Sequence, residues 1–344
     1  MPTREDLELA QQELHDRGFD PAGDWPDSLI TKTYVGVKLV AGKDAGDGVI
    51  VCVNSKLTRR EMSDQGVTAI PTHLAGLPTD VQAEPRAEML RLPLSPDGRV
   101  MYFHGQGVQP LAGEDHRKCY DPAQGGIEMQ PSGKPWVGTF GGLCWYRVRT
   151  SAPEGSRVYY GGFTNNHVSG DGMTRGHAQV QPGGGKAFGN LVVAAPIKFD
   201  GSPNYLDLAL LDLQFGDVWA AIQRQLKGGP VNEGIANFKL RDEVRSDDRT
   251  MGYLDDQICV GVSAKYQVGM GSGRVSLFVD GDVVRRKNGQ AASAGGSSGS
   301  CKIAKATNQI ASHLHAGGGN DSMALPFRNL SRFAGLEWGG FTVP

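Results

Sequence analysis

Three reactive side chains stand in apolar or small-residue surroundings, far apart in the chain. His167 lies in GGFTNNHVSG, Asp207 lies in the strand-like NYLDLALLDL, and Ser298 lies in GGSSGS. A serine hydroxyl becomes a good nucleophile when an imidazole takes its proton, and the imidazole needs a carboxylate to hold its other ring nitrogen. A carboxylate in an apolar strand is costly unless it is paired. These residue types predict acyl transfer by nucleophilic catalysis, with Ser298, His167 and Asp207 as the catalytic residues.

A run of seven small residues, Gly295 to Cys301, surrounds the predicted nucleophile. The run offers three hydroxyls, those of Ser297, Ser298 and Ser300, and Gly296 and Gly299 closely flank Ser298. Glycine allows a backbone N–H to turn toward a developing oxyanion without a clashing Cβ. We therefore predict an oxyanion hole formed by the N–H groups of Gly296 and Ser298.

Short apolar runs broken by Gly, Pro or Asn carry these residues, and the chain holds 49 glycines and 19 prolines. This pattern predicts a mainly β protein with a barrel or sandwich after residue 136. A capping box at Thr3 predicts a helix over 4–17, and strands are expected over 34–40 and 48–56, joined by the polar loop KDAGDG. The charged run EVRSDDR at 243–249 is interpreted as a solvated face.

A stretch rich in Gly and Pro, about 110–135, predicts a domain boundary. We expect a small α/β accessory domain over 1–115 and a larger β domain over 116–344. Docking of substrate, assembly and covering of the active-site cleft all remain open as roles for the first unit.

Bulk composition excludes several classes of partner. The 344 residues are 39% hydrophobic and carry a net charge of −2, so no basic excess points to nucleic acid or an anionic membrane. No apolar stretch is long enough to span a bilayer, and the charged N-terminus is unlike a signal peptide. Five widely spaced cysteines without a CxxC pair predict reduced thiols in a cytoplasmic protein.

The order His…Asp…Ser, in the frames TNNHV, LDLALL and GSSGS, resembles the trypsin/chymotrypsin-like serine peptidases. Residues 260–275 are similar to the opening hairpin of that family's second barrel, and 308–319 to the strand after its nucleophile. The resemblance covers about 136–336. It implies a double β-barrel peptidase domain with the site between the barrels, a protein or peptide substrate, and no cofactor.

The N-terminal part, with VIVCVNSKL and IPTHLAGLPTDV, resembles the extension found in a branch of trypsin-like proteins without signal peptides. That branch includes bacterial members and plant relatives of the narrow-leaf type. The resemblance implies a cytoplasmic protein that forms homo-oligomers.

Two departures from the family concern activation. Ser297 stands where the family usually has Asp, and the nearest candidate activation site, Lys134, is followed by Pro135, which makes a poor cleavage bond. Together they imply an enzyme that forms competent or is controlled by partners. They also leave an alternative from another class, a catalytically silent pseudoprotease that binds a peptide or a partner.

The resemblance also assigns the pocket for the residue before the cleaved bond, called P1. Ala292 holds the pocket-floor position, so selection of Arg or Lys is not expected. His313 stands where glutamyl endopeptidases carry a specificity histidine, which implies cleavage after Glu or Asp, with His315 as the nearest substitute. The alternative is that both are ordinary strand histidines. They share one strand face, but no third ligand is near in sequence, so no metal site is predicted.

Overall fold

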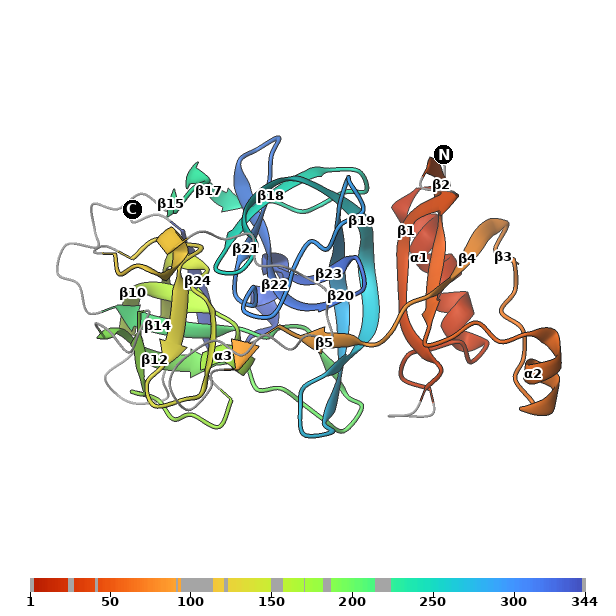
Figure 1. Cartoon of the computed structure of the whole chain (residues 1–344), viewed down its shortest axis with the longest axis horizontal. Coiled ribbons are helices and arrows are strands. Elements are labelled where there is room, and N and C mark those ends of the chain that lie inside the picture. Colours follow the sequence, from red (N-terminus) through yellow and green to blue (C-terminus); the bar gives the residue numbers. More distant parts are fainter. Residues whose placement is uncertain are drawn as a thin grey trace.

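The computed structural model describes residues 3–23, 28–40, 43–90, 92–93, 114–120, 123–149, 157–169, 171–181, 187–213 and 224–341. Its strands form one sheet of 13 strands, one of nine, and a small pair, which confirms the predicted mainly β class. Figure 1 shows the two large sheets beside each other, with the N-terminal elements at the far edge of the larger one. Among the described residues, no helix has the length and apolarity needed to cross a membrane.

Helix α1 (Arg4–Asp16) confirms the first predicted element. The Thr3 hydroxyl accepts the N–H of Asp6, and the Asp6 carboxylate accepts the N–H of Thr3, which satisfies two backbone donors at the helix start. Gly18 follows in the left-handed region, at a φ of 89°, and ends the helix. The buried face, including Leu7 and Leu14, packs toward the strands beneath it.

The N-terminal strands extend the larger sheet. β1 (Ile30–Val40) pairs antiparallel with β2 (Lys43–Val53) on one side and with β19 (Gly252–Gly269) on the other. Both predicted strands are present, but the second ends at Val53 instead of residue 56, and the loop predicted at 43–48 is wrong. Those residues belong to β2 because Leu39 and Val37 pair across the ladder with Asp44 and Asp47. The predicted boundary at 115/116 remains a prediction, and part of the stretch about it lies outside the described residues.

Six antiparallel strands of the larger sheet close into a ring. β19 pairs with β18 over its first part and with β20 over most of its length, and the remaining pairs run β20–β23–β22–β21–β18. Besides β1, β2 and β19, the sheet contains β3 (His73–Leu74), β4 (Leu77–Ala83), β5 (Ala87–Met89), β13 (Pro203–Asn204), β17 (Asn232–Ile235), β18 (Glu243–Asp248), β20 (Val275–Arg286), β21 (Cys301–Ala304), β22 (Gln309–Gly318) and β23 (Asp321–Pro326).

The smaller sheet holds its nine strands in the order β24-β9-β10-β14-β12-β11-β7-β8-β6. It is formed by β6 (Leu92–Pro93), β7 (Glu128–Pro131), β8 (Trp136–Thr139), β9 (Gly142–Val148), β10 (Arg157–Thr164), β11 (Ala178–Val180), β12 (Ala187–Ala194), β14 (Ala209–Leu213) and β24 (Leu336–Gly340). The remaining elements are α2 (Arg59–Asp64), α3 (Asn166–Ser169), the pair β15 (Arg224–Gln225) and β16 (Gly229–Pro230), and the 3₁₀ turns Glu114–Arg117 and Phe327–Arg332.

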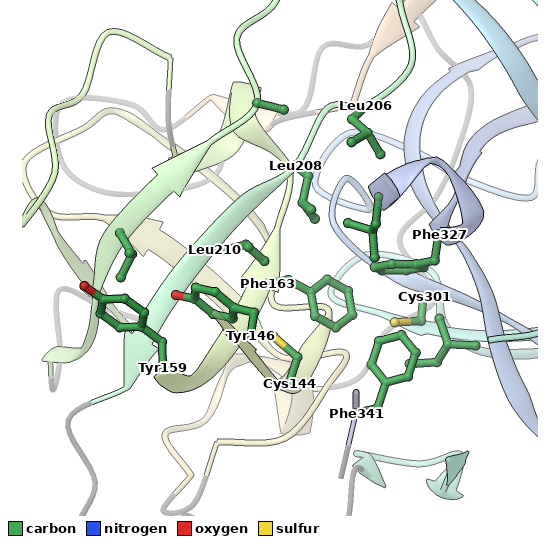
Figure 2. Close-up of a cluster of buried hydrophobic side chains, with 14 of the residues drawn as sticks. Cys144, Tyr146, Tyr159, Phe163, Leu206, Leu208, Leu210, Cys301, Phe327 and Phe341 are labelled. Carbon is green, nitrogen blue, oxygen red and sulfur yellow. The ribbon is translucent and has the colours of Figure 1, made fainter. Parts of the chain in front are cut away.

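A shared hydrophobic core joins the two sheets. Phe163 on β10 stacks edge-on against Phe327, with ring centroids 5.1 Å apart, and Cys301 on β21 lies in the same cluster (Figure 2). Burying an aromatic ring of this kind contributes about 2–3 kcal/mol in transfer free energy. Because side chains from both sheets fill this core, it fixes the position of one sheet relative to the other.

A buried ionic cluster ties the N-terminal strands to the closed ring. Lys32 on β1 contacts the carboxylates of Glu84, at 2.7 Å, and Asp321; Arg285 on β20 contacts the same two, with Glu84 at 2.8 Å. Burial works against ionisation of Asp321, but the two cations beside it hold its pKa well below the usual range. We name these four residues the Lys32 cluster.

Strand β18 corrects a second prediction. The run interpreted as a solvated face is buried from Val244 to Arg249. Asp247 accepts a hydrogen bond from the buried His116, 2.6 Å away, and Arg249 pairs with Glu128 at 2.5 Å. Charge density in the sequence suggested solvent exposure, but these charges are compensated inside the fold.

Candidate active site

The three predicted catalytic residues come from both sheets. His167 lies in the single turn α3 directly after β10, Asp207 lies two residues before β14, and Ser298 lies three residues before β21. The turn is anchored at both ends: Asn166 Nδ2 donates to the carbonyl of Ala195 at 2.7 Å, and Trp136 Nε1 donates to the carbonyl of Val168 at 2.9 Å. The segment that carries His167 is therefore held by side-chain bonds to its neighbours.

The structure brings these three side chains into one hydrogen-bonded chain. His167 Nε2 lies 2.9 Å from Ser298 Oγ, and its Nδ1 contacts Asp207 Oδ2. The other carboxylate oxygen, Oδ1, accepts the backbone N–H of His167 at 3.0 Å. With Nδ1–H donated to the carboxylate, Nε2 carries the lone pair that faces the serine hydroxyl, which is the tautomer a general base requires.

The carboxylate of Asp207 stays ionised despite complete burial. Burial alone raises the pKa of a carboxyl group, but the charge and hydrogen bond of His167 and the hydrogen bond of His315 outweigh it and hold the pKa of Asp207 far below its usual range. Asn165 adds rigidity, because its Nδ2 donates to the Asp207 carbonyl at 2.8 Å. A fixed negative charge therefore faces the inner nitrogen of His167.

Both candidate P1 histidines contact Asp207. His315 Nδ1 lies 3.0 Å from Asp207 Oδ2, and His313 Nε2 lies 3.1 Å from the Asp207 carbonyl oxygen. Both rings are fully buried, which lowers their pKa values, that of His313 to about 4. Burial thus keeps both imidazoles neutral near pH 7. Ala292, the predicted pocket floor, is also buried.

Three of these groups also lie as close together as metal ligands do. One ligand atom each from His167, Asp207 and His315 fall within 4.8 Å of one another. The Nδ1 atoms of both rings, however, hydrogen-bond to the same carboxylate oxygen. Hydrogen bonding accounts for this grouping without an ion.

The run of small residues around the nucleophile has two glycines with positive φ. Gly296 and Gly299 adopt φ values of 93° and 99°, in the left-handed region that disfavours a side chain. Thr139 Oγ1 donates to the Gly296 carbonyl at 2.7 Å, and Thr250 Oγ1 donates to the Gly295 carbonyl at 2.7 Å. With its carbonyls held outward in this way, the loop directs the Gly296 N–H toward the site.

Sequence reasoning missed the partner of Ser297. Its hydroxyl donates to Asp248 Oδ1 at 2.9 Å, and the same oxygen accepts the N–H groups of Thr250 and Met251. A buried carboxylate from β18 therefore holds the residue before the nucleophile. Asp248 lies in the run EVRSDDR, whose charge density predicts a solvated face and so hides this contact.

Sequence reasoning also missed Leu90. Its N–H donates to Ser298 Oγ at 3.2 Å, and its carbonyl oxygen accepts the N–H of Gly296. Ser298 Oγ further lies 3.2 Å from the carbonyl oxygen of His315. His167, Asp207 and Ser298 each have no exposed surface, and Leu90 is 4% exposed. The predicted nucleophile is thus covered by the chain's own backbone.

No protein-family model matches this chain, and no curated protein matches it either. Among solved structures it is similar to protease A of Thermobifida fusca, with 15% identity, a TM-score of 0.42, and coverage of 62% of this chain and 97% of that one. It is also similar to a glutamic acid-specific serine protease (14% identity, TM-score 0.42, 63% and 100% covered) and to Nocardiopsis protease (14%, 0.40, 62% and 97%). At these scores we derive the function from the side chains of the site alone.

Proposed function

We propose that this protein is a serine endopeptidase that hydrolyses peptide bonds through an acyl-enzyme. The observation that carries the proposal is the unbroken hydrogen-bonded chain from Ser298 Oγ through His167 to the buried carboxylate of Asp207. Nucleophile, base and orienting acid stand in the order that acyl transfer requires. The substrate class proposed with it is protein or peptide.

Each step uses a contact already described. Ser298 Oγ attacks the scissile carbonyl carbon while His167 Nε2 takes its proton. The imidazolium is stabilised by Asp207 and then donates the proton to the leaving amine. Water, deprotonated by His167, cleaves the ester and restores the serine. The Gly296 and Ser298 N–H groups stabilise the oxyanion, and one such donor contributes about 3–4 kcal/mol to transition-state stabilisation.

Active-site labelling tests this function directly. A fluorophosphonate probe should label the wild-type protein and should not label Ser298→Ala. Ser300→Ala is the matched control, because Ser300 is a buried serine two residues away whose Oγ has no hydrogen-bond partner among the described residues. Labelling that persists in Ser298→Ala would show that the nucleophile is misassigned.

A silent binding module is the second candidate, and one observation favours it. Ser298 is fully buried beneath Leu90, as in a protein whose groove only holds a peptide. A module of this kind has no need for an ionised Asp207 behind His167, so we favour the enzyme. A folded wild-type protein that neither reacts with the probe nor cleaves a peptide library would favour the binding module.

P1 preference, compartment and assembly are retained as proposals. Acidic P1 recognition draws support from His313 Nδ1, a buried ring nitrogen without a hydrogen-bond partner among the described residues. A reducing cytoplasm is supported by the buried thiols of Cys52, Cys144, Cys259 and Cys301. Cleavage of a peptide library that varies only P1 tests the acidic preference. The mass of the native particle tests whether the protein forms a homo-oligomer.

A further inference from the structure

We propose that this chain is the enzyme's own first substrate, held at the active site through β5 and Leu90 and cut on the carboxyl side of Leu90. The inference rests on the peptidase function proposed above. It names the first substrate of the enzyme and the class of residue that the enzyme accepts at P1. Figure 1 shows the path of the chain toward this site. After the N-terminal strands the chain passes through β5 toward the region of α3, between the two sheets.

On the amino side of Leu90, the segment is bound as an added strand. β5 pairs antiparallel with β22, with Met89 opposite Ala316 and Glu88 opposite Gly317. These partners directly follow His315, which contacts Asp207. Addition of an extended strand to a sheet edge is a general way to hold a peptide in register, because main-chain hydrogen bonds fix its position.

On the carboxyl side, the segment is bound by the other sheet. Leu92 and Pro93 form β6, which pairs antiparallel with β8, opposite Val137 and Trp136. Strand β8 reaches the nucleophile as well, because Thr139 N–H donates to the carbonyl of Ser298 at 2.8 Å. The strands that precede and follow Leu90 in the sequence, β5 and β6, are therefore bound by different sheets, and Leu90 itself lies beside the nucleophile.

The carbonyl of Leu90 stands where a scissile carbonyl must stand. Its oxygen accepts the N–H of Gly296, the donor that the proposed mechanism assigns to the oxyanion. The N–H of the same residue lies 3.2 Å from Ser298 Oγ, so the nucleophile is beside this peptide unit. A segment that merely covered the site would have no need to place its carbonyl on this donor.

The side chain of Leu90 is buried, with 4% of its surface exposed, and lies close to Gly317. A Cβ built on Gly317 would lie 3.2 Å from Leu90 Cδ1 and 2.7 Å from Ser293 Oγ, so only glycine leaves room at that point. Ser293 Oγ is itself engaged by the hydroxyl of Ser322 at 2.8 Å. The side chain held at this position is apolar and uncharged. The structure therefore points to an apolar P1 residue, in competition with the acidic preference predicted from the sequence.

The proposed step balances without any reagent except water. Ser298 Oγ bonds to the carbonyl carbon of Leu90, and its proton passes to His167 Nε2. The peptide C–N bond after Leu90 breaks, and the departing amine takes that proton. Water then adds to the ester carbon, gives a proton to His167, and releases a Leu90 carboxylate and the free serine. The products are residues 1–90 and 91–344.

The experiment follows the purified full-length chain by denaturing gel, intact mass and N-terminal sequencing. Wild type should convert into two pieces, the second beginning Arg-Leu-Pro-Leu, whereas Ser298→Ala should stay whole. Because the segment belongs to the same chain, the first-order rate should not change over a tenfold range of protein concentration. Three results would each overturn the proposal. They are a rate proportional to protein concentration, cleavage of Ser298→Ala into the same two pieces, and a wild-type chain that stays whole.

Substitution at position 90 separates this proposal from the peptidase function. Leu90→Glu should abolish cutting, because a carboxylate buried at this position loses its hydration. Leu9→Glu is the matched control: Leu9 is 63% exposed on α1, and this variant should be cut as wild type is. Faster cutting of Leu90→Glu would overturn the apolar preference.

The same variant reports on the triad independently of cutting. In Leu90→Glu, Ser298 should become accessible to the fluorophosphonate probe, because the larger charged side chain no longer fits at the position of Leu90. If this variant is labelled while wild type stays whole, the peptidase function stands and self-cleavage is wrong. If folded Leu90→Glu is not labelled and wild type stays whole, the peptidase function itself is wrong.

Discussion

The hydroxyl of Ser297 donates a hydrogen bond to Oδ1 of Asp248, a buried carboxylate 49 residues earlier in the chain. Ser297 Oγ also accepts the N–H of Ala294 at 3.2 Å, so one side chain closes the loop and anchors it to β18. The loop that carries the Gly296 N–H is therefore fixed by the fold itself. This arrangement supports an oxyanion hole that is formed before any chain is cut.

Ser297→Ala should weaken both stability and turnover. The substitution removes a hydrogen bond to a buried carboxylate, which typically contributes about 1.5–3 kcal/mol. We expect a loss of about 2 kcal/mol in unfolding free energy, measured by urea denaturation, and a lower kcat on a peptide substrate. Ser300→Ala, in the same run, should retain wild-type values. An unchanged kcat in Ser297→Ala would show that the Ser297–Asp248 hydrogen bond stabilises the fold but has no role in catalysis.

Gly296→Ala should affect catalysis far more than folding. An alanine at a φ of 93° costs about 1–2 kcal/mol and turns the N–H away from the Leu90 carbonyl position. Loss of one oxyanion donor lowers kcat by about 10²–10³-fold. Gly289→Ala is the control, because Gly289 has a φ of 73° with open space around it, so it should lose stability and keep kcat. Equal losses of kcat in both variants would contradict this role.

We predict that His315 positions the carboxylate of Asp207, because its Nδ1 lies 3.0 Å from Asp207 Oδ2. His315→Leu removes this donor and should lower kcat on a peptide substrate with little change in KM. His315→Asn, which keeps a donor, should restore part of the lost kcat. The pKa of His315 is lowered by burial, so the ring contributes no charge near neutrality. Equal losses of kcat in both variants would instead indicate a packing role against Phe278, whose ring centroid lies 4.2 Å from that of His315.

The stability of the fold should depend on pH through His313. Burial lowers its pKa from 6.5 to about 4 in the folded state, so between these values the unfolded chain binds a proton that the native state does not. The contribution of neutral, buried His313 to the free energy of unfolding is fully present above pH 6.5 and is lost as the pH falls toward 4. His313→Gln should remove it, so the stability of wild type relative to the variant should fall by about 2 kcal/mol between pH 7 and 5.

Only the difference between the two proteins isolates that effect. Burial raises the pKa of Asp282 to about 7 in the folded state. The native state therefore takes up a proton before the unfolded chain does, so Asp282 stabilises the fold as pH falls and opposes the effect of His313. Urea denaturation of both proteins at each pH cancels the Asp282 contribution. A difference that is constant with pH would show that His313 is not a buried neutral imidazole.

Local pattern was enough for some features. The capping box predicted α1, the alternation of short apolar runs with glycines predicted a mainly β fold, and the order of His167, Asp207 and Ser298 predicted that they share a site. The first two predictions rest on patterns within a few residues, and the third rests on the order of three residues along the sequence. The contact of Leu90 with Ser298 and that of Ser297 with Asp248 join segments 208 and 49 residues apart. No local pattern encodes such pairings, because they follow from how two sheets meet.

The Lys32 cluster has a consequence for the form in which the protein works. Lys32 and Glu84 precede Leu90, whereas Arg285 and Asp321 follow it, and β1 pairs with β19 across the same junction. If the chain is cut after Leu90, neither half can leave without exposing four paired charges and an open strand edge. We then expect the two pieces to stay together as one particle in a native mass spectrum and to separate into two bands on a denaturing gel. Expression of residues 91–344 alone should not yield that particle.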